Sequence, residues 1–169
     1  QHVVEVYDVA AHPRPYMVME YVDGFNLRQI LSRRGPLPLR DVFSLMLQIS
    51  SGLAAIHERG VIHGNLKPEN IMVDRDGWSK ITDLGLASNS GAPDRAVKGD
   101  DRPGTPAYMA PELIRGGPGT AQTDLYALGC LLYELLVGQS PFVATDPSEM
   151  CRQHLEVPHP PVRGLTRTI

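Results

Sequence analysis

Residues 63–85 read HGNLKPENIMVDRDGWSKITDLG, and the rest of the chain is organised around them. The stretch presents Asn65, Lys67 and Asn70 on an expected loop, continues through an expected hairpin and places Asp83 directly before a glycine. Carboxylate and amide oxygens are ligands that Mg²⁺ prefers and that it shares with phosphate groups. The stretch therefore predicts a site for a nucleoside triphosphate and its magnesium ions. One residue departs from that chemistry, because Asn65 offers an amide where phosphoryl transfer calls for a carboxylate.

Composition limits the class of protein and its partners. The 169 residues carry a net charge of −3 and are 42% hydrophobic and 21% charged, as in an ordinary globular domain. Because no basic excess exists to neutralise phosphates, we expect no nucleic-acid partner. No apolar run reaches the roughly 20 residues that span a bilayer, so we expect no membrane segment. The chain has no initiating Met, and we expect it to be a fragment of a longer protein.

The cysteines indicate a reducing compartment. Cys130 and Cys151 do not make a disulfide framework, and Cys130 stands in an apolar run that predicts a small buried side chain. We therefore expect a cytoplasmic location, either for the whole protein or as the intracellular part of a larger membrane protein.

Hydrophobic periodicity predicts a mixed α and β chain. The clearest helix runs from Pro38 to Gly60, because apolar residues recur there at spacings of three and four. These residues are Val42, Met46, Ile49, Leu53 and Ile56. Further helices are expected at Leu27–Arg33, at Ala110–Arg115, after a cap at Thr123, and at Pro147–Leu155. Strands are expected at Val3–Tyr7, Tyr16–Val22, Val61-Ile62, Ile71–Val73 and Trp78–Ile81. Residues 87–104 are polar and rich in Gly and Ser, which predicts a mobile surface loop.

An ordered set of short motifs gives the chain a resemblance to a known family. His63–Asn70 matches the pattern H-R-D-L-x-x-x-N except at two positions, Asp83-Leu84-Gly85 resembles D-F-G, and Ala110-Pro111-Glu112 is the A-P-E triplet. Gly104–Met109 precedes that triplet as in kinase substrate loops, and Asp124–Gly129 resembles the start of a central helix. The chain resembles the C-terminal lobe of a eukaryotic-type Ser/Thr protein kinase, and its nearest likeness is to bacterial members.

The resemblance implies an α+β, protein-kinase-like fold. Residues 1–22 would supply the last two strands of the N-lobe and the hinge, and residues 23–169 would form a mainly helical C-lobe that is truncated before its last helices. The Gly-rich phosphate loop, the strand lysine and its glutamate partner would lie before Gln1.

The resemblance also assigns the metal and phosphate ligands. Asn70 and Asp83 match the family residues that hold Mg²⁺, and Lys67 matches the lysine on the transferred phosphoryl group of ATP. As ordinary loop residues, the same Asn and Asp would fix turns, and the lysine would be solvated. Both interpretations stay open at this point.

The strand before Asp23-Gly24 resembles the hinge that binds adenine. By that resemblance the Glu20 carbonyl and the Val22 amide meet the adenine edge, and Met19 gates the deeper pocket. Met72 would pack under the ring, and Asn26 would contact the ribose. A core strand and a helix cap explain Met19, Met72 and Asn26 almost as well.

Other family residues are expected to be structural. Asp124 would accept hydrogen bonds from the backbone of the 63–70 loop, and Glu112 would pair with an arginine of a later helix. The remaining histidines show no metal spacing, so surface or capping roles are expected for His2, His12, His57, His154 and His159.

Two departures from the family pattern bear on function. Asn65 stands where the family has its catalytic Asp, and a neutral amide is a very poor base. Gly64 stands where an arginine would bind a phosphorylated activation loop. The pattern therefore favours a pseudokinase that binds ATP and Mg²⁺, phosphorylates weakly or not at all, and contacts a protein substrate or a regulatory protein partner. The alternatives are an active Ser/Thr protein kinase that tolerates Asn65 and an inert gene fragment.

Overall fold

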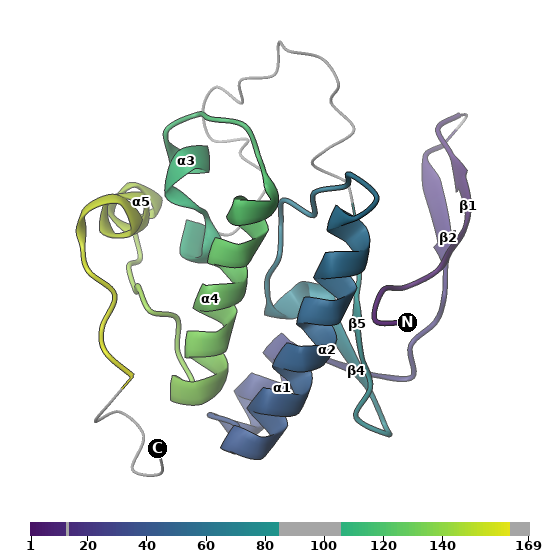
Figure 1. Cartoon of the computed structure of the whole chain (residues 1–169), viewed down its shortest axis with the longest axis horizontal. Helices are drawn as coiled ribbons and strands as arrows, with labels where there is room; N and C mark the ends of the chain where they lie inside the picture. Colours follow the sequence, from purple (N-terminus) through teal and green to yellow (C-terminus); the bar gives the residue numbers. More distant parts are fainter. Residues whose placement is uncertain (13, 85–105, 163–169) are drawn as a thin grey trace.

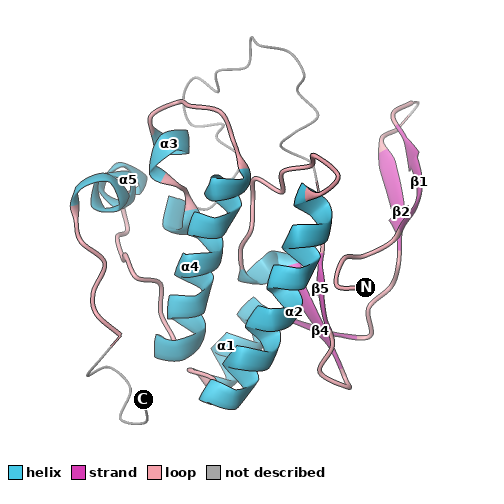
Figure 2. Ribbon diagram, viewed as in Figure 1, coloured by secondary structure: helices cyan, strands magenta, loops and turns pink. Residues whose placement is uncertain are grey.

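The structure is a computed structural model that describes residues 1–12, 14–84 and 106–162 of the 169-residue chain. Helices α2 (Leu39–His57) and α4 (Ala121–Val137) pass side by side through the middle of the molecule (Figure 1). A strand hairpin lies on one side of this pair, and two shorter helices lie on the other (Figure 2). The α+β class expected from the sequence is confirmed. The loop expected at 87–104 lies outside the described residues.

The other elements are short. The strands are β1 (Val6–Ala10), β2 (Tyr16–Met19), β3 (Gly24–Asn26), β4 (Ile71–Asp74) and β5 (Ser79–Ile81). The remaining helices are α1 (Leu27–Arg34), α3 (Pro111–Ile114) and α5 (Pro147–Glu156), with 3₁₀ turns η1 (Pro68–Asn70) and η2 (Pro106–Tyr108). The hairpin around Asp76-Gly77 and the helix after Asp146 are confirmed.

Helix α2 supplies one wall of the core. Its buried side chains lie three and four residues apart, as an amphipathic helix requires. They are Val42, Leu45, Ile49, Leu53 and Ile56. Each contributes about 1.5–3 kcal/mol of burial free energy. The expected stripe was wrong at one position, since Leu45 is buried and Met46 is only partly buried at the edge of the core.

Helix α2 also has the length and composition of a membrane-crossing helix, with a mean hydropathy of 1.2. The sequence prediction of no such run was therefore too strict. Core helices meet the same criteria, and α2 packs its buried face against α4 and β5. This packing accounts for the apolar residues of the buried face, whereas Leu39, Phe43 and Leu47 are exposed.

Helix α4 is the other wall and begins earlier than expected. Thr120 is its N-cap, and Thr123 is the third helical residue that bonds back to the Thr120 amide at 3.0 Å. Both threonines take part in one capping box, so the expected cap at Thr123 was misplaced by one turn. Leu125 is 56% exposed, whereas Cys130 is buried as expected. Burial raises the pKa of the Cys130 thiol to about 12.

The strands form two separate sheets. Strands β1 and β2 pair antiparallel, and β3, β4 and β5 form a second antiparallel sheet in that order. In the second sheet Met72 lies opposite Asn26 on one side and Lys80 on the other. Residues directly opposite each other in a sheet share a face, so these three form a row across it.

The N-terminal residues differ from the expected strand. Val3 forms a parallel bridge with Ile81, and the Val4 amide donates to the Ile81 carbonyl at 3.0 Å. The first residues therefore lie along β5, and β1 starts only at Val6. This pairing joins positions far apart in sequence, so local alternation does not reveal it.

Two other expectations about strands were wrong. The strand expected over Tyr16–Val22 ends at Met19, and Gly24 begins the separate strand β3, where the backbone approaches β4 closely. A Cβ on Gly24 would lie 1.9 Å from the Val73 carbonyl oxygen, so glycine is required. Val61-Ile62 has no strand partner among the described residues and is coil.

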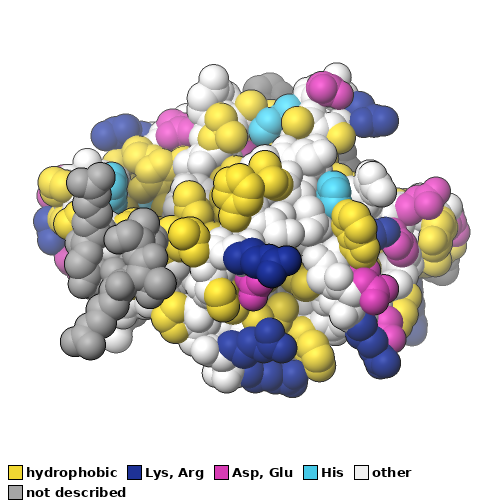
Figure 3. Space-filling model, turned by 60° about the horizontal axis from the view of Figure 1, so that its bottom comes forward, with side chains coloured by type: hydrophobic (Ala, Val, Ile, Leu, Met, Phe, Trp, Pro, Cys, Tyr) yellow, Lys and Arg dark blue, Asp and Glu magenta, His cyan; other side chains and the backbone are white. Residues whose placement is uncertain are grey.

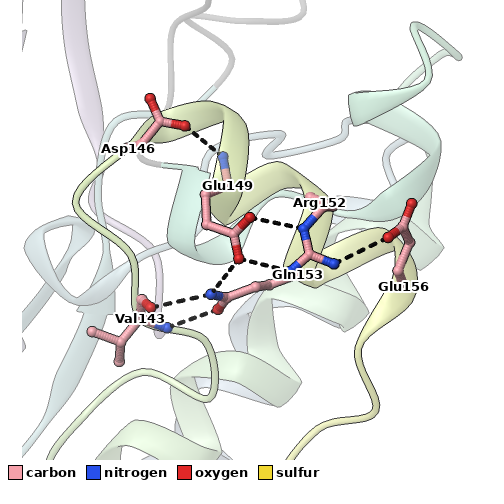
Figure 4. A network of polar contacts seen from close by, with 6 residues as sticks. All are labelled: Val143, Asp146, Glu149, Arg152, Gln153 and Glu156. Atoms are coloured by element: carbon pink, nitrogen blue, oxygen red, sulfur yellow. Dashed lines mark hydrogen bonds and ion pairs between the residues drawn. The ribbon is translucent and has the colours of Figure 1, made fainter.

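Helix α5 is fixed by a polar network (Figure 4). Asp146 caps it by accepting from the Glu149 amide at 2.7 Å, and Arg152 bonds both Glu149 and Glu156. Gln153 bonds the backbone of Val143 and ties the preceding loop to the helix. These contacts are exposed, so they orient the helix more than they stabilise it.

The surface shows no dominant charge in the view of Figure 3. Apolar side chains alternate there with Lys and Arg and with Asp and Glu, and neither sign covers the face. This distribution agrees with the small net charge of −3. It offers no basic stripe on that face for a nucleic-acid backbone.

Candidate functional site

The loop at residues 63–65 is held through its backbone by one carboxylate. Asp124, which is 1% exposed, accepts hydrogen bonds from the amides of His63 at 2.9 Å and Gly64 at 2.8 Å. It also bonds His57 Nε2 at 2.8 Å. The role predicted for Asp124 is confirmed. Because these contacts are made to amides, Asp124 supports the loop without any contact to the side chain of Asn65.

His63 connects this loop to the segment that carries Asp83. Its Nδ1 accepts from the Asn65 amide at 3.2 Å, so Nε2 carries the proton and donates to the Thr82 carbonyl at 3.0 Å. The ring is fully buried, and burial lowers its pKa, so the imidazole is neutral at pH 7. A neutral ring preserves this pattern of one donor and one acceptor.

Asn70 is buried and oriented by a single contact. Its Nδ2 donates to the Asn65 carbonyl at 2.9 Å, and because a carbonyl only accepts, the orientation of the amide follows. The Asn70 carbonyl in turn accepts from the Thr82 amide at 2.9 Å. The structure therefore brings Asn65, Asn70 and the residue before Asp83 together, and among the described residues no hydrogen bond to the side-chain oxygen of Asn70 is seen.

Backbone conformation distinguishes Asp83 from its neighbours. Its φ of 58° makes it the non-glycine residue with a positive φ in the described part of the chain. Such conformations cost about 1–3 kcal/mol and cluster at functional sites. Gly64 has a φ of 72°, which glycine adopts without that cost. Strain is thus present at Asp83 and relieved at Gly64.

Lys67 precedes η1 in an extended conformation and is partly exposed. Its carbonyl accepts from the Asn70 amide at 2.9 Å, so the backbone of this turn fixes the spacing between the two residues. Within the described ranges there is no group of three or more His, Cys, Asp or Glu side chains that could hold a metal. A metal site here would thus depend on Asn70 and Asp83.

The predicted adenine-binding residues lie on the link between β2 and β3 and on the second sheet. Glu20 and Val22 belong to the link, and both are partly buried. Met72 is paired with Asn26 in the row across the sheet. Asn26 caps α1, since its side chain accepts from the Gln29 amide at 2.8 Å. The capping interpretation of Asn26 is confirmed, and its use as a ribose contact stays a prediction.

Sequence reasoning missed a second polar centre on α4. Arg28 bonds Glu69 at 2.9 Å, Glu134 at 2.5 Å and the Tyr108 hydroxyl at 2.6 Å, and Tyr108 also donates to Glu134. Burial and the hydrogen bond to Glu134 raise the pKa of Tyr108. Through Glu69 and Tyr108 the network ties η1, which ends at Asn70, to η2. Arg28 and Glu134 are 106 residues apart, so only paired variation across relatives could have revealed them.

Surface or capping roles were expected for two histidines that instead bond to other side chains. His57 bonds Asp124, as described above. His154 is buried, contacts the Tyr126 hydroxyl at 2.7 Å and lies edge-on to Phe142 at 4.6 Å. Burial lowers the pKa of His154. His154 stands at the end of the buried face of the amphipathic helix α5. This position in the helical pattern was the available sequence signal for its burial.

Glu112 has a different partner from the one expected. Its Oε1 accepts from the Thr123 hydroxyl at 3.0 Å, so Glu112 joins α3 to the first turn of α4. The arginine expected for it in a later helix is not among the described residues.

These features define a class of protein. A carboxylate on a central helix holds the backbone of a loop. A buried Asn follows this loop directly before a hairpin, and a strained Asp follows the hairpin. This is the architecture of the phosphoryl-transferring lobe of kinases. The family model described as protein kinase domain matches residues 1–162. The chain belongs to the protein kinase family, with the bacterial Ser/Thr kinases among its relatives.

Several bacterial proteins are similar over nearly the whole chain. The serine/threonine-protein kinase PknB of Mycobacterium leprae is 38% identical over 165 residues, which cover 94% of this chain and 26% of PknB. PknB of Mycolicibacterium smegmatis is 38% identical over 173 residues, with 95% and 27% covered. The serine/threonine-protein kinase PknL of Mycobacterium tuberculosis is 38% identical over 159 residues, with 94% and 40% covered. The chain thus spans between about a quarter and two fifths of these relatives.

Proposed function

We propose that the protein is a pseudokinase that binds ATP and Mg²⁺ and transfers phosphate weakly or not at all. One observation carries the proposal: Asn65 stands at the base position of a loop whose supporting contacts to Asp124 and His63 are complete. The site is therefore built for the chemistry but has an amide where the base should be. Its partners would be a protein substrate or a regulatory protein, in the cytoplasm.

The residues present fit a magnesium nucleotide. The Asn70 amide nitrogen is occupied by the Asn65 carbonyl, so its oxygen would be the ligand for Mg²⁺, with the Asp83 carboxylate as the second ligand from this chain. Lys67 would lie on the terminal phosphate. Bound ATP with Mg²⁺ supplies the phosphoryl group for transfer, and this chain's own residues orient it.

The nucleoside end of ATP has candidate contacts on the other side of the site. The Glu20 carbonyl and the Val22 amide would meet the adenine edge, with Met72 beneath the ring. The side-chain oxygen of Asn26 serves as the helix cap, so its amide NH₂ would face the ribose. We accordingly propose residues 1–22 as N-lobe strands and hinge and residues 23–169 as C-lobe.

Loss of the base has a calculable consequence. A positioned general base contributes typically about 10²–10⁴-fold to the rate. That factor corresponds to roughly 3–5 kcal/mol of activation free energy. Asn65 still orients a hydroxyl group by hydrogen bonding, so nucleotide and substrate binding persist while proton removal fails.

An active Ser/Thr kinase is the second candidate. Lys67, Asn70 and Asp83 match the family pattern, and the relatives above carry the name serine/threonine-protein kinase. This candidate requires phosphotransfer in the presence of Asn65. An inert gene fragment is the third candidate, and it would bind no nucleotide.

The melting temperature of the full-length protein tests the proposed site. Mg²⁺-ATP should raise the melting temperature of wild type by several degrees, because a ligand at 100 times its Kd adds about 2.7 kcal/mol. Asp83→Ala should abolish the shift. Asp76→Ala, which removes an exposed carboxylate from the β4–β5 turn, is the matched control and should preserve it. A wild type that shows no shift, or equal shifts in wild type and Asp83→Ala, would contradict the assignment.

A further inference from the structure

Glu20 makes contacts that its expected role at the adenine edge does not use. That role involves only its backbone carbonyl, yet its carboxylate has two partners. One oxygen pairs with Lys80 of β5, and the other accepts from the Glu5 amide at 3.3 Å. The Glu20 amide donates back to the Glu5 carbonyl at 2.8 Å. Glu20 is thus bound to the N-terminal segment on one side and to β5 on the other.

These contacts join parts of the fold that share no sheet. The β1–β2 hairpin and the β3–β4–β5 sheet are separate, and the chain passes between them through residues 20–23. The N-terminal segment already lies along β5 through Val3 and Val4. The Glu20–Lys80 pair therefore fixes the link against the sheet at the point where the predicted adenine contacts lie.

Lys80 is placed to act on the nucleotide site. It lies opposite Met72, which lies opposite Asn26, so the row that would carry adenine and ribose ends in Lys80. Lys80 is also three residues before Asp83. The ion pair is partly buried, at 23% exposure for Lys80 and 26% for Glu20, so solvent screens it less than an exposed pair. The Lys80 ammonium holds the pKa of Glu20 below its usual range, so the carboxylate is charged at neutral pH.

We propose that Glu20 and Lys80 are positioning residues that hold the 20–22 link over the Asn26–Met72 row and so give the nucleotide site its selectivity for adenine. The proposal depends on the proposed function, because it concerns the same nucleotide site. Hydrogen bonding to a base edge demands accurate placement of the link carbonyl and amide. Contacts to phosphate through Mg²⁺ involve Asn70 and Asp83 and do not depend on the link.

The chain offers a matched control pair. Asp23 and Arg75 also connect the link to the β4–β5 hairpin, with 3.0 Å between carboxylate and guanidinium. The side chain of Asp23 is 60% exposed and that of Arg75 is 80% exposed, so this pair contributes little to stability. The two pairs differ in burial and in their position relative to the Asn26–Met72 row. These two differences are what the comparison tests.

The test measures the Kd of Mg²⁺-ATP and of Mg²⁺-GTP by titration calorimetry on the full-length protein. Lys80→Gln should raise the Kd of Mg²⁺-ATP about tenfold and leave the Kd of Mg²⁺-GTP nearly unchanged. The ratio of the GTP constant to the ATP constant should therefore fall by about the same factor. Lys80→Arg keeps the charge and should keep the ratio. Arg75→Gln should match wild type for both nucleotides.

The outcomes separate the two proposals. If wild type binds neither nucleotide, the proposed function fails. If wild type prefers ATP and Lys80→Gln keeps the same ratio of the two constants, whether or not both affinities fall, the positioning role is wrong. The proposed function then still stands. Should Lys80→Gln fold poorly, the same ratio measured on Glu20→Gln decides the question, because this variant removes the charge from the other partner.

Discussion

The loop His63–Asn65 and the pair Asn70 and Asp83 are joined by one hydrogen bond, yet they differ in what each retains of the family pattern. Around Asn70 and Asp83 the ligand side chains are present and the backbone is strained at Asp83. In the loop the supporting contacts are present, but Asn65 replaces the base and Gly64 removes the strain. Under the proposed function, one half of the site would hold a magnesium nucleotide, and the other half would keep its shape without its base.

The difference teaches that scaffold and chemistry are specified by different atoms. Asp124 recognises backbone amides, so it supports the loop without regard to the side chains that the loop displays. The metal binding proposed for Asn70 and Asp83 has no such backbone substitute, because it would require side-chain oxygens. Under the proposed function, the Asn65 side chain removes the base of the first region without unfolding it, whereas a change of side chain at Asn70 or Asp83 would abolish metal binding in the second.

Removing the scaffold should have the largest effect on stability. Asp124→Ala leaves the amides of His63 and Gly64 buried without a partner and should lower the free energy of unfolding by about 3–5 kcal/mol. Asp124→Asn keeps one acceptor oxygen and should cost less. Urea denaturation of the full-length protein measures both. Equal stability of wild type and Asp124→Ala would show that the loop does not depend on this carboxylate.

Acid should weaken the folded state through its buried neutral histidines. The pKa values of His63 and His154 are lowered by burial, so below about pH 6.5 the unfolded chain binds protons that the folded chain excludes. The free energy of unfolding should therefore fall as the pH falls from 7 to 5, by at most about 1.4 kcal/mol per pH unit for each neutral ring.

Replacing one of these rings checks the sign of the pH effect. His154→Gln should reduce the slope of stability against pH in this range. Denaturant midpoints measured at successive pH values give the slope. A variant with the same slope as wild type would remove His154 from the explanation.

Backbone strain gives a smaller contrast between the two regions. Gly64→Ala places a side chain at a φ of 72° and should destabilise the fold by about 1 kcal/mol, while Gly64→Asn should cost less because Asn tolerates this region. At Asp83 the same preference for glycine over alanine holds, so Asp83→Gly should be about 1 kcal/mol more stable than Asp83→Ala. Thermal or chemical unfolding ranks the four variants. If alanine and asparagine are equivalent at position 64, strain is not what distinguishes the regions.

Local pattern predicted the elements whose information is local. The α2 periodicity, the Asp76-Gly77 turn and the start of α5 after Asp146 each depend on residues within one or two turns, and each is confirmed. The family motifs likewise placed Asp124 correctly. At Thr120 the pattern was ambiguous, because two threonines three residues apart each cap the other's amide.

The remainder depends on contacts between distant residues. The pairing of the N-terminal segment with β5 and the Arg28–Glu134 contact join residues 78 or more positions apart, from Val3 to Ile81 and from Arg28 to Glu134. Hydrophobic periodicity carries no information on such partners. For the same reason surface or capping roles were expected for His57 and His154, since a lone histidine on a helix gives no sign of a buried acceptor.

The measurement that tests the central claim most directly is single-turnover transfer of the γ-phosphate of ATP to a generic protein substrate by wild type and Asn65→Asp. If the site lacks only its base, Asn65→Asp should raise the rate by about 10²–10⁴-fold with unchanged affinity for Mg²⁺-ATP. Adding Asp83→Ala to this variant should abolish the gain. A wild type that already transfers phosphate as fast as Asn65→Asp, or an Asn65→Asp variant that binds Mg²⁺-ATP without any gain in rate, would contradict the account.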